Sequence, residues 1–117
     1  MKKTILVVED FRSVRAMISQ SLKMSGYNVL EAADGKEALK FFNGKKIHLV
    51  LTDLDMPNMD GTTLARKIKS MFAYRKTPIV MLTTKAYRDD PNVVDWLTKP
   101  VSAQKLIDVV KHNVLAD

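Results

Sequence analysis

The sequence predicts an α/β domain in which helices cover both faces of a parallel β-sheet. Short apolar runs of strand length alternate along the chain with segments whose apolar residues recur at helical spacing. The apolar runs are nearly continuous, as expected for strands that are buried on both sides. This alternation is typical of a parallel sheet with crossover helices packed against it.

The first half of the chain is expected to form three strands and two helices. Each strand is a short apolar run, and the three are predicted at residues 5–8, 27–32 and 48–52. Between the first two strands, apolar residues at helical spacing predict a helix that stops at Gly26. A shorter helix follows the Asp34-Gly35 turn and ends near Asn43-Gly44.

The second half adds two strands and two helices. The strands are predicted at residues 79–82, directly after Thr77-Pro78, and at residues 96–98. A helix follows Gly61, and its buried face is expected to hold Leu64, Ala65, Ile68 and Phe72. Ser102 can cap the last helix, whose inward stripe consists of Leu106, Ile107, Val110 and Val114.

The connection between the last two strands is unusually short. Only sixteen residue steps separate Thr83 from Lys99, and they must supply two loops, any helix and a strand. Pro91 also stands where the interior of a crossover helix would lie. We therefore expect a loop here, with at most one helical turn near Asn92 to Val94.

Length and composition indicate one globular domain over residues 1–117, with no attached output domain. The chain is 46% apolar, yet no apolar stretch approaches the ~20 residues of a membrane span. Met1-Lys2-Lys3 leads into a strand rather than a signal-peptide core, so the cytoplasm is the expected location. The absence of cysteine excludes disulfides and thiolate ligands, which leaves hard oxygen ligands for any metal.

The net charge of +6 raises the question of an acidic partner. The cations are spread through the sequence, and no dense basic block is interleaved with aromatic residues. Nucleic acid is therefore a minor hypothesis, and we expect neither a nucleic-acid nor a membrane partner.

Four of the predicted strands end on residues suited to phosphate chemistry. The strand ends carry Glu9-Asp10, Asp53, Thr83 and Lys99. Because the carboxyl ends of parallel strands share one edge of a sheet, these side chains are expected to converge. A lone acid after a strand is usually a helix cap, and Thr83 or Lys99 alone would be an ordinary surface residue. Together they can hold a divalent cation and a phosphoryl group.

Five motifs follow one another over nearly the whole chain: Val7-Val8-Glu9-Asp10, Ala33-Asp34-Gly35-Lys36-Glu37-Ala38-Leu39, Thr52-Asp53-Leu54-Asp55-Met56-Pro57-Asn58-Met59-Asp60-Gly61, Leu82-Thr83-Thr84 and Lys99-Pro100. In this order they resemble the receiver domains of two-component response regulators, specifically the stand-alone CheY-like kind, with a shortened fourth crossover. The resemblance implies a doubly wound, flavodoxin-like sheet of five parallel strands in the order 2-1-3-4-5. The fourth helix of that fold is expected to be short or absent here.

The resemblance also implies a function and a site. Asp53 would accept a phosphoryl group from a histidine kinase, with Thr83 and Lys99 contacting the phosphoryl oxygens. Mg²⁺ would be held by Asp10, Asp53 and the backbone carbonyl of Asp55, with Glu9 acting directly or through water. Such a protein is a phosphoacceptor with self-catalysed transfer and autodephosphorylation rather than an enzyme.

Further expectations come from the same resemblance. Thr83 and Trp96 would act as the switch that reports phosphorylation to a downstream protein, and chemotaxis is the expected pathway. Asp55 and Lys85 would tune how long the phosphoryl group lasts. The Lys99-Pro100 peptide bond is expected to be cis. Where the chain departs from the family, the shortened crossover is expected to expose the flank of the sheet, which favours self-association or an element exchanged between chains, and so a homodimer.

Two other classes of protein remain open. One is a receiver-like interaction module that works without phosphorylation, against which the complete set of pocket residues argues. The other is an aspartyl-phosphate phosphatase resembling the haloacid dehalogenases, whose Asp-x-Asp motif matches Asp53-Leu54-Asp55. Here that motif comes in mid-chain before Met-Pro, and the chain has no room for a cap domain.

Overall fold

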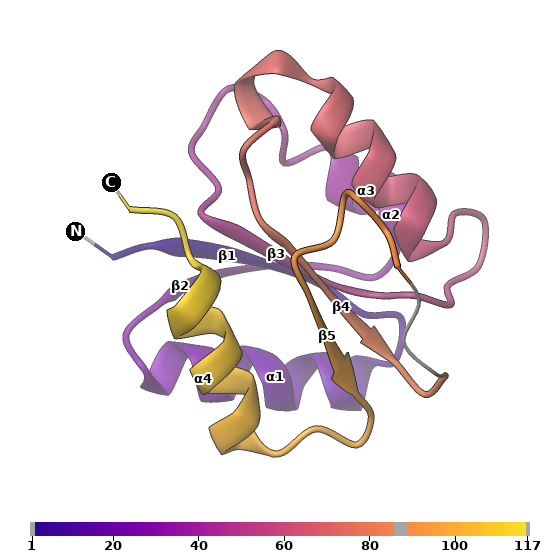
Figure 1. Ribbon diagram of the computed structural model, residues 1–117. Coiled ribbons are helices and arrows are strands. Elements are labelled where there is room, and N and C mark those ends of the chain that lie inside the picture. The colour runs from indigo at the N-terminus through magenta and orange to yellow at the C-terminus, as the bar shows by residue number, and fades with distance from the viewer. Residues whose placement is uncertain (1, 86–88, 117) are drawn as a thin grey trace.

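The computed structural model, which describes residues 2–85 and 89–116, confirms the predicted fold class. Five parallel strands form one sheet in the order β2-β1-β3-β4-β5 (Figure 1). The strands are β1 (Thr4–Val8), β2 (Asn28–Ala32), β3 (Leu49–Asp53), β4 (Ile79–Thr83) and β5 (Asp95–Thr98). The helices are α1 (Arg12–Met24), α2 (Gly35–Leu39), α3 (Gly61–Ser70), the 3-10 helix η1 (Phe72–Tyr74) and α4 (Ala103–Asn113).

The helices form a layer on each face of the sheet. Helices α1 and α4 cover one face, and α2 and α3 cover the other (Figure 1). Alternate residues of the central strands point into the two resulting cores, so that Leu51 packs under α1 and α4 while Val50 packs under α2 and α3. Strands β3 and β4 are buried along their whole length, which explains why their sequences are continuous apolar runs.

The register of the strands brings their carboxyl ends to a common edge. Val8 of β1 lies beside Thr52 of β3, and Asp53 lies beside Leu82 of β4. Thr83 in turn pairs with Thr98 at the end of β5. The residues that follow β1, β3, β4 and β5 must therefore emerge side by side.

Three helices begin at side chains that accept a backbone hydrogen bond. The carboxylates of Asp34 and Asp60 each accept a hydrogen bond at 2.8 Å from the backbone N–H of the residue three positions later in the chain. In the same way, Ser102 Oγ accepts the Lys105 N–H at 3.2 Å. These are N-caps, which satisfy backbone donors that have no partner inside the helix. The predicted cap at Ser102 is confirmed.

The connection between β4 and β5 contains no helix in its described part, residues 84–85 and 89–94. The Val93 N–H donates to the Asp90 carbonyl at 3.1 Å, and the Asn92 N–H donates to the Asp90 carboxylate at 2.8 Å. These bonds form a tight turn around Pro91, whose ring favours the second position of such a turn. The expected loss of the fourth crossover helix is confirmed here, and residues 86–88 lie outside the described part of the chain.

The prediction that Phe72 is buried by the third helix is wrong. Helix α3 ends at Ser70, and Phe72 instead begins η1 with 79% of its surface exposed. Tyr74 takes the buried place and meets the ring of Phe42 edge-on, with the ring centroids 4.8 Å apart. Helix α3 ends two residues before Phe72, the last residue of the predicted apolar face.

Among the described residues, no helix combines the length and the apolar composition that crossing a bilayer requires.

Candidate functional site

The carboxyl edge of the sheet gathers the predicted site residues from four separate stretches of the chain. Glu9 and Asp10 follow β1, Asp53 ends β3, Thr83 ends β4 and Lys99 follows β5. Asp53 and Glu9 are almost completely buried, at 3% and 0% exposure. Ionisable groups that are withdrawn from water in this way need partners close by.

Lys99 supplies one such partner for both acids. Its ammonium group lies 2.6 Å from Glu9 Oε1 and also forms an ion pair with Asp53 Oδ1. The Lys99 backbone N–H donates to the Thr83 carbonyl at 2.9 Å, which attaches the residue to the end of β4. The Lys99–Pro100 peptide bond is cis, as the resemblance implies.

Glu9, Asp10 and Asp53 form a compact cluster of oxygens. One carboxylate oxygen from each can be chosen so that all three lie within 4.8 Å of one another. Asp10 Oδ1 is buried and has no hydrogen-bond partner among the described residues. A buried polar atom without a partner is uncommon in a folded protein. Hard carboxylate oxygens in this arrangement fit Mg²⁺, and a cation held there would satisfy the orphan oxygen.

The two buried acids titrate very differently. Burial raises the pKa of Asp53 to about 8, helped by the hydrogen bond and the negative charge of Glu9 and opposed by Lys99. Burial would also raise the pKa of Glu9, but its hydrogen bonds with Asp53, Lys99 and the Phe11 N–H outweigh that effect and lower it to about 2. Asp53 and Glu9 are in contact and titrate as a coupled pair, in which Asp53 is the weaker acid.

The pKa of Lys99 is affected in two opposing ways. Burial lowers it, whereas the hydrogen bonds and charges of Asp53 and Glu9 raise it, and the net shift is upward. Lys99 therefore remains an ammonium ion, available to a second anion as well as to the two carboxylates.

Thr83, Lys85 and Asp55 are linked to one another at the entrance to the site, where the side chains of Lys85 and Asp55 reach the solvent. Thr83 is 4% exposed, and its hydroxyl oxygen accepts the Lys85 N–H at 2.9 Å. The Lys85 ammonium lies 3.3 Å from Asp55 Oδ1, and both side chains are more than half exposed. Such an exposed pair contributes little to stability, about 0 to 1 kcal/mol, because water screens it. The role of the Asp55 carbonyl as a metal ligand stays a prediction.

Trp96 lies further from the edge than the other predicted residues. It pairs with Met81 of β4 and is half-buried. Its neighbour Leu97 points into the core under α1 and α4, so Trp96 lies on the opposite face, the side of α3. On that side, residues 84–85 and 89–94, which are the described part of the connection between β4 and β5, form no crossover helix.

Gly61 lets helix α3 begin directly against the site. A Cβ atom at this position would lie 2.3 Å from the Asp53 carbonyl oxygen and 2.6 Å from Met81 Sδ. The Gly61 N–H donates to the Leu54 carbonyl at 2.7 Å, which closes the loop that follows Asp53. Only glycine permits this approach of the helix to the strand end.

Some residues that hold the site in place escaped the sequence analysis. Arg15 Nη1 donates to the Glu9 carbonyl at 2.8 Å, and the Phe11 N–H donates to Glu9 Oε2 at 3.1 Å. Thr52 Oγ1 donates to the Asp53 carbonyl at 3.0 Å. No pattern in the sequence indicates these contacts, because they depend on side-chain conformations within the loop after β1 and within β3, and on how α1 lies beside the end of β1.

Comparisons with known proteins agree with this geometry. The family model for the response regulator receiver domain matches residues 5–111. The chain resembles the solved structure of chemotaxis protein CheY4 of Vibrio cholerae, with a TM-score of 0.88 and 30% identity over 97% of this chain and 99% of that one. It also resembles response regulator TrrA of Thermotoga maritima, solved in complex with Mg²⁺-BeF, with a TM-score of 0.83 and 31% identity over 94% of this chain and 97% of that one.

A curated relative is the sensor histidine kinase CheAY of Helicobacter pylori, 32% identical over 94% of this chain. The chain spans only 15% of the length of CheAY, so the likeness concerns one part of that protein. The match of the family model covers most of the 117 residues and coincides with the sheet and its carboxyl-edge site. The chain therefore belongs to the response regulator receiver domain family.

Proposed function

We propose that this chain, as one receiver domain over residues 1–117, accepts a phosphoryl group on Asp53 from a partner histidine kinase. The observation that carries the proposal is the buried contact of Lys99 with both Glu9 and Asp53, beside the unpartnered oxygen of Asp10. One ammonium and three carboxylates at the carboxyl edge of the sheet can bind a cation and a phosphoryl group at the same time.

Each residue has a role in this reaction. A carboxylate oxygen of Asp53 attacks phosphorus while the bond to the donor's leaving group breaks, which leaves an acyl phosphate on Asp53. Lys99 then pairs with a phosphoryl oxygen, and the hydroxyl of Thr83 donates to another. Glu9, Asp10, Asp53 and the Asp55 carbonyl would hold Mg²⁺, which when bound neutralises negative charge on the phosphoryl oxygens.

The proposed output is a change in protein contacts. Phosphorylation would draw Thr83 inward, and Trp96 would change its burial, because the new phosphoryl contacts stabilise one of two states. A downstream protein would read that change, without nucleic acid in this step. The names of CheY4 and CheAY favour a chemotaxis pathway, and the proposed location is the cytoplasm.

Treatment with acetyl phosphate and Mg²⁺ tests the proposal directly. We expect intact mass spectrometry to find one added phosphoryl group, which Asp53→Asn abolishes and the control Asp60→Asn retains. Removal of Mg²⁺ with a chelator should also prevent the gain in mass. An unchanged mass for the wild-type chain would favour the interaction module that works without phosphorylation.

The phosphatase alternative makes the opposite prediction. Continuous release of phosphate from a monoester, with many turnovers per chain, would support it. Labelling that stops at one phosphoryl group per chain would exclude it.

A homodimer is a second part of the proposal, and it depends on the flank of β5. That flank has no crossover helix in its described part, and Val94 next to it is 51% exposed. Light scattering at high concentration should show dimers. A monomer both with and without a phosphate analogue would contradict this part.

A further inference from the structure

A hollow lies at the edge of the sheet opposite the proposed phosphorylation site. It has a volume of about 320 Å³ and is formed by the segments that lead into β3 and β4. Its lining includes Lys45, Lys46, Arg75 and Lys76, together with the apolar residues Ile47 and Leu115. We call this feature the amino-edge hollow.

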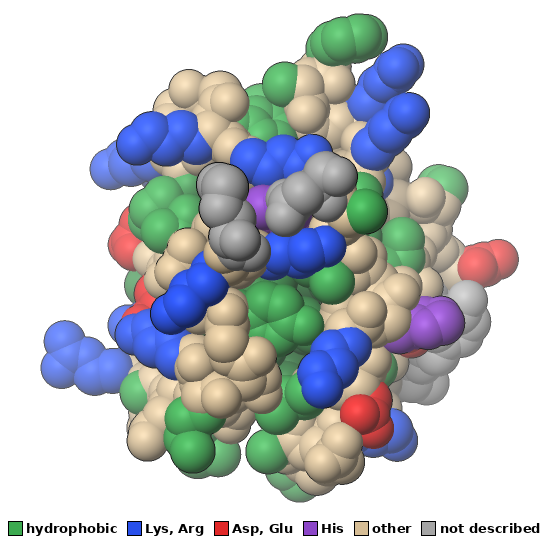
Figure 2. All heavy atoms as spheres, turned by 90° about the vertical axis from the view of Figure 1, so that its left-hand side faces the viewer, with side chains coloured by type: hydrophobic (Ala, Val, Ile, Leu, Met, Phe, Trp, Pro, Cys, Tyr) green, Lys and Arg blue, Asp and Glu red, His purple; other side chains and the backbone are tan. Residues whose placement is uncertain are grey.

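The charge of the amino-edge hollow is entirely positive. No Asp or Glu stands among the described residues that line it, and its four cations are exposed. Figure 2 shows Lys and Arg side chains gathered over this face of the molecule, with few acidic ones. The four cations come from two dipeptides about thirty residues apart, so they appear scattered in the sequence and meet only in the folded chain.

Hydrogen bonds join the two segments into a fixed frame. The hydroxyl of Tyr74 donates to the Lys45 carbonyl and accepts the Gly44 N–H, both at 2.8 Å. Lys69 Nζ donates to the Arg75 carbonyl at 3.1 Å, which holds the second segment against α3. Since the hollow is already formed, a ligand would not have to order these loops on binding.

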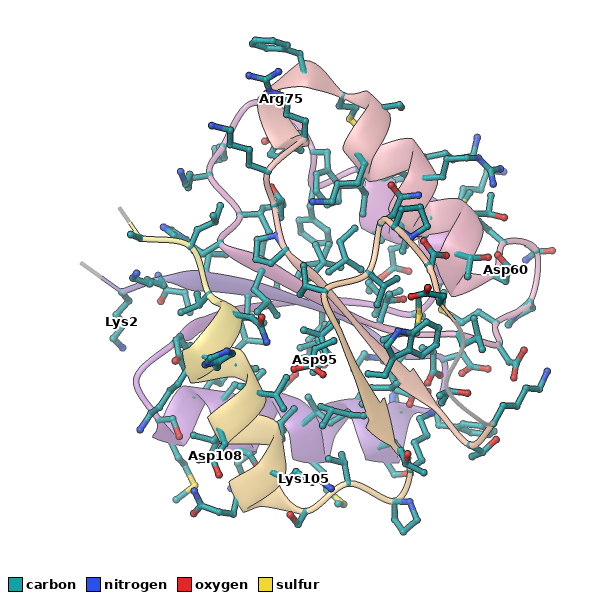
Figure 3. The ribbon with its side chains drawn as sticks, viewed as in Figure 1. Lys2, Asp60, Arg75, Asp95, Lys105 and Asp108 are labelled. Atoms are coloured by element: carbon teal, nitrogen blue, oxygen red, sulfur yellow. The ribbon has the colours of Figure 1, made fainter. Side chains whose placement is uncertain are left out.

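An exposed aromatic ring stands at the rim. The ring of Phe72 is 79% exposed, and the Arg75 guanidinium lies 4.6 Å from its centroid. Figure 3 shows Arg75 at the end of the molecule far from Asp60, which marks the start of α3 near the phosphorylation site. An aromatic ring beside a planar cation offers a surface on which a nucleic-acid base can stack.

We propose that the amino-edge hollow binds a nucleotide, with its phosphates on Lys45, Lys46 and Lys76 and its base against Phe72 and Arg75. The volume lies within the range of small-ligand pockets, which begins at about 300 Å³. The nucleotide is either free or part of a single strand, because both sources present the same phosphates and base.

Two other anionic partners fit less well. A membrane surface cannot enter a hollow, and insertion of Phe72 into lipid would either break its stack with Arg75 or carry that charge with it. An acidic peptide would satisfy the lysines but would make no use of the Phe72 ring surface that stays exposed beside Arg75. The ring therefore favours the nucleotide.

Fluorescence anisotropy with a labelled twelve-nucleotide oligothymidylate tests the single-strand source, and titration with ATP tests the free source. Both are done without added Mg²⁺, so that the carboxylate cluster does not take part. Three or four phosphate contacts predict a slope of about −2 to −3 for log affinity against log salt concentration. In NMR spectra, the amide signals of residues 44–47 and 72–77 should shift, and those of residues 9, 10 and 53 should not.

Charge reversal supplies a matched pair of variants. Lys45→Glu with Lys76→Glu should weaken binding by about tenfold or more, since each removes a charged contact. Lys67→Glu with Lys105→Glu makes the same change in net charge at exposed positions outside the hollow and should weaken binding by less than about threefold. Phe72→Leu, which removes the aromatic ring, should weaken binding of the oligonucleotide, whereas Phe72→Trp, which keeps an aromatic ring, should bind it as tightly as the wild type.

Each outcome decides for or against the proposal. Binding of the oligonucleotide but not ATP assigns the single-strand source, and binding of both with equal strength assigns the free nucleotide. The proposal is overturned if neither binds at low salt, or if the two charge-reversal pairs weaken binding equally. It is also overturned if polyglutamate of the same charge binds as tightly, or if only anionic vesicles bind.

Discussion

The substitution Gly61→Ala should destabilise the protein through a collision at the phosphorylation site. The added methyl group would lie 2.3 Å from the Asp53 carbonyl oxygen and 2.6 Å from Met81 Sδ. The first contact is with backbone in the centre of the sheet, and Met81 is fully buried, so neither atom can move away at low cost.

The expected magnitude follows from two opposing effects. Overpacking of this kind costs about 3 kcal/mol, the upper part of its usual range, because one of the two atoms belongs to the backbone. Replacing glycine by alanine in a helix returns up to about 1 kcal/mol. The net loss in unfolding free energy is therefore about 2 kcal/mol, which corresponds to a fall in Tm of about 8 °C for a chain of 117 residues.

Gly35→Ala is the matched control. Gly35 also occupies the first position of a helix after an aspartate cap, but the nearest atom to its added methyl group is Met59 Sδ, at 2.7 Å. The end of a methionine side chain can move, so the gain in helix propensity should offset most of the cost. Urea denaturation of both variants is the assay. Equal losses for the two, or a change below about 0.5 kcal/mol for Gly61→Ala, would refute the reasoning.

Three further predictions concern the cap of α3, the metal site and its entrance. Asp60→Ala should lower the unfolding free energy by about 1 kcal/mol, measured by urea denaturation at neutral pH. The hydrogen bond from the Thr63 N–H lowers the pKa of Asp60 in the folded protein, so the carboxylate stabilises the fold above its unfolded pKa and loses this effect as the pH falls through its folded pKa. The difference in stability between wild type and Asp60→Ala should therefore disappear in acid. Mg²⁺ affinity, measured by calorimetry, should fall by up to about tenfold per pH unit below about 8, because the proton on Asp53 competes with the cation; an affinity independent of pH would contradict the raised pKa. Lys85→Ala should change the unfolding free energy by less than about 0.5 kcal/mol, since its pair with Asp55 is exposed, but should shorten the lifetime of the phosphoryl group as followed by loss of label; an unchanged lifetime would remove Lys85 from that role.

The meeting of residues at the carboxyl edge could be anticipated from the sequence pattern, whereas the strand order came only from the resemblance to receiver domains. Continuous apolar runs indicate strands buried on both faces, and parallel strands place their carboxyl ends together whatever their loops contain. The short crossover was equally predictable, because sixteen steps with Pro91 among them leave too little chain for a helix. These inferences depend only on local period and chain length.

Other features depend on where a helix ends and on how neighbouring segments pack in space. The exposure of Phe72 follows from where α3 gives way to η1, which the apolar pattern does not mark. The contact of Arg15 with the Glu9 carbonyl depends on how α1 packs beside β1. Propensity and period describe one segment at a time, and so they carry no information about such contacts.

The sequence by itself determined which chemical groups stand at the ends of the strands, because the pattern of apolar residues sets the strands and a parallel sheet aligns their ends. Only the tertiary structure decided how those groups interact: the raised pKa of Asp53, the lowered pKa of Glu9 and the contact of the Lys99 ammonium with both arise from burial and from separations of a few ångströms. The same holds for the four cations of the amino-edge hollow, which two distant segments bring together. Electrostatic energy depends on separation and on the exclusion of water, and both exist only once the chain has folded.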